Sequence, residues 1–265
     1  MYINKIKRLL IIGIFIYVPF QSFAWGLLGH RIVGQIADDY LTGKARKEIY
    51  KILGTESIAM SSNWADFIKS DPSYGYLSNW HYINIKGGLT REQVMTFLDN
   101  DTATDAYTKV NFMMSELRRK DLPTENKLLF LRMLIHIAGD LHQPLHTGRE
   151  EDLGGNKIKV LWFNIPYNLH HVWDEELIHF QQLSYTEYAA AINHPKKAET
   201  KEWLKEPVSN WIYQSYQLAE NVYSDIKQPD QKLDYKYNFA YLASLNLQLL
   251  RGGIHLAGLL NDIFG

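Results

Sequence analysis

Apolar residues recur with helical spacing along most of the chain. Between Arg31 and Leu41 they lie three or four positions apart, and the same period returns in later segments bounded by glycine, proline or capping residues. The pattern predicts a mainly α protein. The predicted helices cover residues 31–41, 44–53, 57–69, 90–98, 105–119, 125–140, 185–193, 196–205, 210–226 and 235–260, with a further helical start at residue 168.

Strand patterns are rare by comparison. Residues 157–163 alternate between polar and apolar after Gly154-Gly155-Asn156, and turn residues follow near 164–167, which predicts one short β-hairpin. Residues 80–85 are expected to be short and extended. Since no linker or internal repeat divides the remaining chain, residues 25–265 are expected to form a single multi-helix domain.

The first 24 residues have the pattern of a secretory signal peptide. Basic residues precede an apolar run over 9–20, and Ser22-Phe23-Ala24 provides a small-x-small cleavage site. The alternative is a retained anchor helix, which is disfavoured because the run is short and no stop-transfer pattern follows. We therefore expect a secreted or periplasmic protein whose mature chain begins at Trp25.

Composition restricts the possible chemistry. The sequence contains no cysteine, which excludes thiolate metal sites and disulfides. Loss of the signal segment would remove three of the 28 basic residues and none of the 29 acidic ones, leaving a net negative chain. A protein of this charge that binds phosphate groups needs a local source of positive charge.

Histidine and aspartate concentrate between residues 134 and 146. His136 and Asp140 lie four positions apart on a predicted helix and therefore share one face. Pro144 cannot continue the helix, so His146 is expected to return to the same end from another direction. The alternative for this stretch alone is a capped helix end with one core histidine.

A second pair, His170 and Asp174, repeats the four-residue spacing. In the absence of thiols, imidazole and carboxylate are the remaining zinc ligands. Eight candidate ligands exceed one tetrahedral site and indicate a cluster, although spacing alone leaves the number of ions open. These candidates are His30, Asp66, His81, His136, Asp140, His146, His170 and Asp174.

Six motifs carry a resemblance to a known family. They are Trp25-Gly-x-x-Gly-His30, Trp64-Ala-Asp66, Trp80-His81-Tyr82, His136-x-x-x-Asp140-x-His142-Gln-Pro-Leu-His146, Gly154-Gly155-Asn156 and Asn168-Leu-His170-x-x-Trp173-Asp174. In this order they resemble the three-zinc single-strand-specific nuclease family, which includes fungal single-strand nucleases, plant bifunctional nucleases and bacterial relatives. The resemblance implies the α-helical fold shared by zinc phospholipase C and these nucleases.

The resemblance also implies three Zn²⁺ ions and their ligands. One ion would be bound by the amine and carbonyl of Trp25 with His30, and another by Asp66, His81 and His136, with Asp140 bridging the two. The third would be bound by His146, His170 and Asp174. Cleavage before Trp25 would create one of these ligands, because a free α-amine loses its proton near pH 8 whereas an internal amide does not.

Four accessory residues follow from the same resemblance, and three have plainer alternatives. Lys69 would steady the phosphoryl group, or be a solvated surface lysine. Tyr82 would stack on a base, or be a core tyrosine. Asn156 would bond a base edge, or only close a turn. Asn84 stands where many eukaryotic members have a catalytic aspartate, so any mechanism that needs a side-chain base there is in doubt.

The implied function is a zinc-dependent endonuclease that cleaves single-stranded DNA and RNA to 5′-phosphate products, with 3′-nucleotidase activity as a further expectation. We expect a monomer without stable membrane association. One alternative is a zinc phospholipase C, which is disfavoured because those enzymes have a longer spacing from Trp to His and a glutamate where this chain has Asp174. A non-catalytic zinc-binding protein is the second alternative.

Overall fold

The computed structural model describes residues 25–265, so the predicted signal segment 1–24 lies outside the described residues. The first half of the described chain is helical, as expected. Its elements are α1 (Leu27–Asp39), α2 (Gly43–Leu53), α3 (Ile58–Ser61), α4 (Trp64–Phe67), η1 (Ile68–Ser70), η2 (Pro72–His81), α5 (Arg91–Asp99), α6 (Ala106–Leu117), α7 (Thr124–Asp140) and η3 (Pro144–Thr147).

The second half contains the strands and the two long C-terminal helices. Its elements are β1 (Lys159–Trp162), β2 (Ile165–Asn168), α8 (Leu169–His171), η4 (Val172–Glu176), α9 (Leu177–His179), α10 (Tyr185–Ile192), α11 (Lys197–Trp203), α12 (Val208–Asp225), β3 (Gln231–Leu233) and α13 (Tyr235–Phe264). The prediction of a mainly α fold is confirmed.

The prediction of one continuous helix over residues 57–69 is wrong. Ser57 caps α3, and the chain then bends at two buried polar residues before α4 begins. The hydroxyl of Ser62 donates to the carbonyl of Ala59, and the amide of Asn63 donates to the carbonyl of Leu27. Such side-chain bonds to the main chain compete with helix continuation. The bend gives α4 its own direction on the surface of α7.

The extended segment predicted over residues 80–85 is correct only from Tyr82 onward, because residues 80 and 81 end η2. The main-chain amides of Ile83 and Ile85 donate to the carbonyls of His146 and Gly148. Both isoleucines are buried. Because side chains alternate along an extended chain, Tyr82 and Asn84 lie on the opposite side.

The predicted hairpin is present as antiparallel β1 and β2, but the sheet has a third strand. β3 pairs in parallel with β1, with Val160 opposite Gln231 and Trp162 opposite Leu233. The sequence did not predict β3 because three residues are too few to show an alternating pattern.

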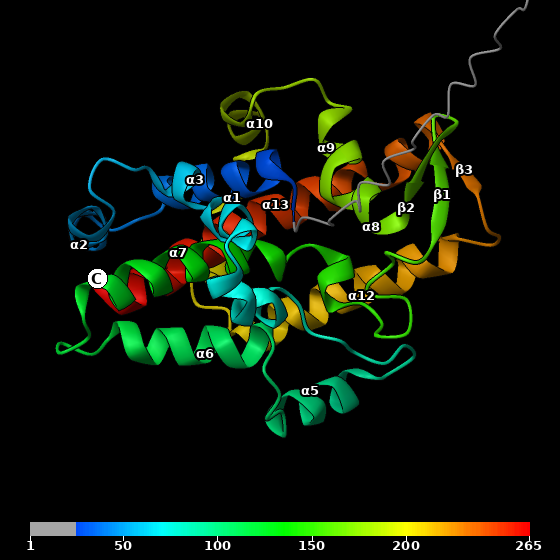
Figure 1. Cartoon of the computed structure of the whole chain (residues 1–265). Helices are drawn as coiled ribbons and strands as arrows, with labels where there is room; N and C mark the ends of the chain where they lie inside the picture. Colours follow the sequence, from blue (N-terminus) through cyan, green and yellow to red (C-terminus); the bar gives the residue numbers. More distant parts are fainter. Residues whose placement is uncertain (1–24) are drawn as a thin grey trace, which may run out of the picture.

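Helix α13 runs through the centre of the molecule, with α7, α1 and α12 beside it (Figure 1). It contacts α1 over much of its length and also contacts α2 and α7. Gly253 permits this approach, since a Cβ there would lie 2.5 Å from Ile36 and 3.0 Å from the carbonyl of Val33. Across residues 25–265, every helix is too short or too polar to span a bilayer.

Candidate metal centre

Asp140, the last residue of α7, lies where α7, α1 and η2 meet. Its Oδ2 is 3.1 Å from His81 Nδ1 and 3.3 Å from His136 Nε2, and its Oδ1 is 3.3 Å from His30 Nε2. All four residues are buried. The two carboxylate oxygens thus face different imidazoles, as a bridging carboxylate requires. The predicted shared face of His136 and Asp140 is confirmed, and the alternative of one isolated core histidine is wrong.

The imidazoles and carboxylates form three groups whose potential ligand atoms lie within 4.8 Å of one another. The first two share His136 and together contain all the candidate ligands around Asp140, including Asp66, whose Oδ1 is 3.7 Å from His136 Nε2. The groups are His30, Asp66 and His136; His81, His136 and Asp140; and His146, His170 and Asp174.

The third group is built by the chain segments after α7 and after the hairpin. His170 Nε2 lies 3.2 Å from Asp174 Oδ2, which confirms that the two residues share a helical face. Asp174 belongs to a single π-helical turn, η4, and its Oδ1 accepts a hydrogen bond from Gln143 Nε2 at 2.5 Å. The ring of His146 lies 5.0 Å from that of His170.

Main-chain carbonyls fix the orientation of three imidazoles. Each ring donates from Nδ1, which leaves Nε2 as the atom that can bind a metal. No residue type marks these acceptors in the sequence, because a carbonyl is present at every residue. The bonds, each 2.6 Å long, run from His136 to Ser62, from His146 to His81 and from His170 to Gly154.

Gly154 and Gly155 form the turn that presents this last carbonyl. Their φ angles are +61° and +82°, which favour glycine. A Cβ on Gly154 would also lie 2.4 Å from the carbonyl oxygen of Leu145. The Gly-Gly-Asn motif therefore positions His170, a role that the sequence pattern alone did not indicate.

The unpaired polar atoms of the centre fit metal ions. Each is buried and has no hydrogen-bond partner in the described chain, an arrangement that costs free energy unless a cation compensates. Imidazole nitrogen and carboxylate oxygen are the donor set expected for zinc. The atoms are His30 Nδ1 and Nε2, Asp66 Oδ2, His81 Nε2, Asp140 Oδ1, His146 Nε2 and Asp174 Oδ2.

The electrostatics support the same interpretation. Burial raises the pKa of Asp140 well above its usual value, because the ionised carboxylate loses its hydration. Burial likewise lowers the pKa of His81 and of His146 well below the usual value, which favours the neutral imidazole that binds a metal. A bound cation would favour the ionised form of Asp140 and leave the imidazoles neutral.

Trp25 lies at the start of the described chain and is fully buried. The main-chain amide of the next residue, Gly26, donates to the carbonyl of Asp174 at 2.8 Å. A Cβ on Gly139 would lie 2.9 Å from His30 Nδ1 and 3.8 Å from the Trp25 ring. The first described residues are therefore held between the third group and the end of α7.

Two accessory candidates lie at the edge of the centre. Lys69 Nζ is 2.6 Å from Asp66 Oδ1, and the lysine side chain is 24% exposed, so Lys69 is paired with the centre. Tyr82 is 38% exposed, and its hydroxyl donates to Asn79 Oδ1. The alternative of a core tyrosine is therefore wrong.

The two asparagine candidates differ in their contacts. Asn84 is half-buried on the same side of its segment as Tyr82. The Nδ2 of Asn156 donates to the carbonyl of Leu153 at 2.8 Å, so this side chain closes its own turn. That contact occupies the Nδ2 of the side-chain amide. The Oδ1 of Asn156 remains able to accept a hydrogen bond from a base edge.

A buried series of hydrogen bonds that starts just after the C-terminal end of α7 was not predicted. His142 donates from Nδ1 to the carbonyl of Ala138, and its Nε2 is 2.7 Å from His255 Nδ1. His255 Nε2 lies 3.0 Å from Glu206 Oε2, and the ring stacks on Trp211 with centroids 4.6 Å apart. These hydrogen bonds connect the end of α7 with α13. No sequence pattern relates histidines 113 positions apart.

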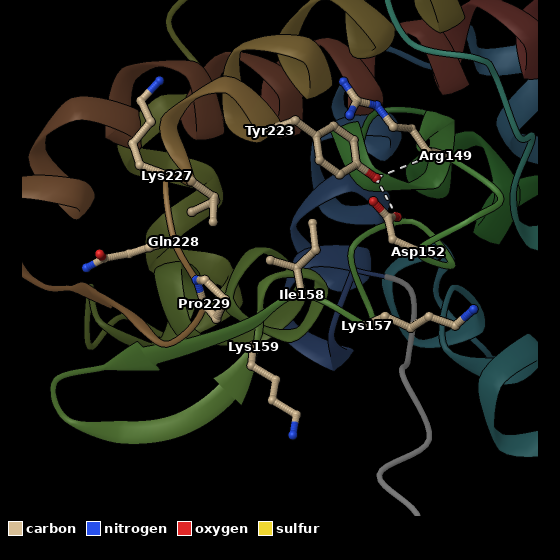
Figure 2. A pocket seen from close by; sticks show the side chains of 10 residues that line it. Arg149, Asp152, Lys157, Ile158, Lys159, Tyr223, Lys227, Gln228 and Pro229 are labelled. Carbon is tan, nitrogen blue, oxygen red and sulfur yellow. Dashed lines mark hydrogen bonds between the residues drawn. The ribbon is translucent and has the colours of Figure 1, made fainter.

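A separate cavity of about 510 Å³ lies between residues 149–159 and the end of α12. Arg149 donates its main-chain N–H to the Tyr223 hydroxyl, which in turn donates to Asp152 (Figure 2). Lys157, Lys159 and Lys227 line the cavity, but their side chains extend in different directions (Figure 2). None of the predicted site residues lines it.

Comparison with known proteins agrees with the geometry of the centre. The family model described as S1/P1 Nuclease matches residues 25–265. The chain belongs to the S1/P1 nuclease family. This membership confirms the resemblance and the mainly helical nuclease fold, and it places the chain among hydrolases that act on ester bonds.

Three relatives match this chain along at least 90% of their own length. Endonuclease 3 of Arabidopsis thaliana is 28% identical over 92% of this chain and 90% of its own, and Endonuclease 2 of the same organism is 28% identical over 94% of both. Nuclease P1 of Penicillium citrinum is 27% identical over 91% of this chain and 98% of its own. The chain is thus similar to complete plant and fungal nucleases.

Proposed function

We propose that this S1/P1 nuclease family member is an exported, zinc-dependent endonuclease that cleaves single-stranded DNA and RNA. The observation that carries the proposal is the buried Asp140 carboxylate, whose two oxygens face imidazoles from three elements. Together with the separate His146, His170 and Asp174 group, it provides ligands for more than one ion. Clustered cations would supply the local positive charge that the acidic chain lacks.

The proposed ligand sets follow the family pattern. Trp25, through its free amine and carbonyl, and His30 would hold one ion, with Asp140 between this ion and the next. The bonds to Ser62, His81 and Gly154 support the sets by fixing three of the imidazole rings. The second set would be Asp66, His81 and His136, and the third His146, His170 and Asp174. When bound, zinc supplies Lewis acidity at the scissile phosphate.

Lys69 and Tyr82 would act on the substrate itself. The Lys69 ammonium lies at the edge of the centre, where it would bond a phosphoryl oxygen and stabilise the charge that develops there. The exposed ring of Tyr82 would stack on one base, with Asn156 Oδ1 accepting from a base edge. Stacking on a ring requires a base that is free of its neighbours, which is the physical reason for single-strand preference.

Asn84 restricts the mechanism. Its amide can orient a water molecule through a hydrogen bond, but it cannot accept a proton at neutral pH as an aspartate could. We therefore propose that the reaction proceeds without a side-chain base at this position. Products with 5′-phosphate ends, 3′-nucleotidase activity, a monomeric state and a secreted or periplasmic location complete the proposal.

The role of Trp25 gives a direct test of the function and of its dependence on export. Two chains are compared, one that begins at Trp25 and one that carries a single additional methionine before it. The extra residue converts the α-amine into an amide, so the second chain is expected to bind one zinc fewer and to lose most cleavage of single-stranded DNA. Equal zinc content and activity would contradict the role of the amine.

The same two chains distinguish the alternatives. Both are assayed on single-stranded DNA and on phosphatidylcholine vesicles, before and after chelation and zinc addition. Phosphatidylcholine hydrolysis without DNA cleavage would indicate a phospholipase C. Zinc binding without either activity would indicate a non-catalytic zinc protein.

A further inference from the structure

A continuous series of aromatic rings lies beside the metal centre on η2, α4, α6 and α7. We call it the aromatic surface. Neighbouring ring centroids are 5.4 to 6.5 Å apart, and most pairs meet edge to face. In order, the rings are Trp64, Tyr74, Tyr76, Trp80, Phe112 and Phe130.

Two rings of this surface are open to solvent. Tyr76 is 56% exposed and Phe112 is 41% exposed, and both meet the buried Trp80 edge to face. Exposed large apolar groups that adjoin one another indicate an interaction surface, whereas isolated ones need no explanation. Trp80 therefore acts as a rigid support between two accessible rings.

The aromatic surface is continuous with the metal centre through the chain. Trp80 directly precedes His81, whose imidazole contacts Asp140. Trp64 lies two residues before Asp66 on α4. Both ends of the segment 64–81 thus contribute to the centre, and this segment carries the exposed Tyr76, while the exposed Phe112 of α6 packs against Trp80 of the same segment.

The cations beside these rings suit a polyanion. Lys109 Nζ lies 5.2 Å from the centroid of Trp80 and 5.4 Å from that of Phe112. Among the described residues, the contacts of the Lys109 ammonium are with these two rings and not with a carboxylate. Its charge is therefore available to a phosphate between two bases. Arg132 lies 5.5 Å from the Trp64 ring but is already paired with Glu56.

We propose that the aromatic surface binds the bases of a single-stranded nucleic acid as the strand runs away from the metal centre, with Tyr76 and Phe112 each stacking on one base. The inference rests on the proposed nuclease function and extends it to a site for additional nucleotides. Tyr76 and Phe112 each contact the intervening Trp80, with ring centroids 6.0 Å and 6.4 Å from it. Bases stacked on the two exposed rings would therefore be bound separately, as in an unstacked single strand.

The test compares a dinucleotide with a dodecanucleotide as substrates of the zinc-loaded enzyme. The variants are Tyr76→Ala, Phe112→Ala and Lys109→Gln. The matched control is Phe239→Ala, which removes a ring that is 86% exposed on α13. For each protein, the ratio of kcat/KM on the long substrate to that on the short one is measured.

We expect each aromatic variant to lower this ratio roughly fivefold or more, through a higher KM for the dodecanucleotide, as the loss of one stacked base predicts. Lys109→Gln should weaken the dependence of this KM on salt concentration. Phe239→Ala should retain the wild-type ratio. If Tyr76→Ala and Phe112→Ala both fold correctly and both keep the wild-type ratio, the inference is overturned. If the wild-type enzyme cleaves neither substrate, the proposed function is overturned instead.

Discussion

Replacing Gly154 by alanine tests how the main chain controls the third group of ligands. The residue has φ of +61°, which costs an alanine about 1–2 kcal/mol. The new Cβ would also lie 2.4 Å from the carbonyl oxygen of Leu145, and relief of such a contact inside a packed turn costs about 1–3 kcal/mol more. The expected loss of unfolding free energy is therefore about 2–5 kcal/mol.

The displacement of the turn also moves the Gly154 carbonyl, which accepts from His170 Nδ1 at 2.6 Å. Loss of such an orienting bond typically weakens metal binding about 10- to 100-fold. We expect Gly154→Ala to release the zinc of its weakest site at a chelator concentration about 10- to 100-fold lower than wild type does. Competition titration with a chelator measures this affinity, and urea unfolding of the same samples measures the loss of stability.

Gly88→Ala provides the matched control, because Gly88 has φ of +77° but a Cβ there meets no atom within 4 Å. This variant should lose about 1–2 kcal/mol of stability and retain its zinc affinity. Wild-type affinity for all of the zinc in Gly154→Ala would show that the Gly154 carbonyl is irrelevant to metal binding by His170.

Three further predictions concern other parts of the structure. Burial raises the pKa of Asp105 to about 7, above its unfolded value, so ionisation opposes folding and stability falls as pH rises from about 4 to about 7. Asp105→Asn keeps the helix cap. In urea melts, the unfolding free energy of this variant minus that of wild type should be about 1–2 kcal/mol larger at pH 8 than at pH 4, with solvent screening taken into account. The same difference at both pH values would contradict this prediction. Lys69→Ala should lower kcat about 100-fold, and a change in KM alone would argue against its role in charge stabilisation. His255→Phe should keep the stack on Trp211 but cost about 2–4 kcal/mol in urea unfolding, because His142 and Glu206 lose a buried partner; an unchanged midpoint would show that the hydrogen-bonded chain is dispensable.

The sequence predicted the helices well where amphipathic segments end at clear caps. Thr90 caps α5 in a capping box, and the paired spacing of His136 and Asp140 on α7 is realised in the structure. Prediction failed where single side-chain contacts decide the local conformation. The bonds made by Ser62 and Asn63 divide a predicted helix, and the Asn63 bond reaches Leu27 of α1, which is distant in sequence.

The candidate ligands could be found from the sequence because their residue types and spacings carry the chemistry. Their supports could not. The carbonyl of Gly154 and the pairing of His142 with His255 depend on how distant segments pack, and neither has a residue-type signal. The aromatic surface was missed for a related reason, since Phe112 joins Trp80 only through the packing of α6 against η2.

We propose that the clustered histidines and aspartates around Asp140 form a zinc-dependent nuclease site. The most direct measurement is single-stranded DNA cleavage by the chain beginning at Trp25, with zinc content determined in the same sample after chelation and during stepwise zinc addition. Cleavage is expected to return as zinc approaches three per chain and to leave 5′-phosphate ends. A sample verified to contain three zincs per chain that leaves single-stranded DNA and RNA intact would contradict it.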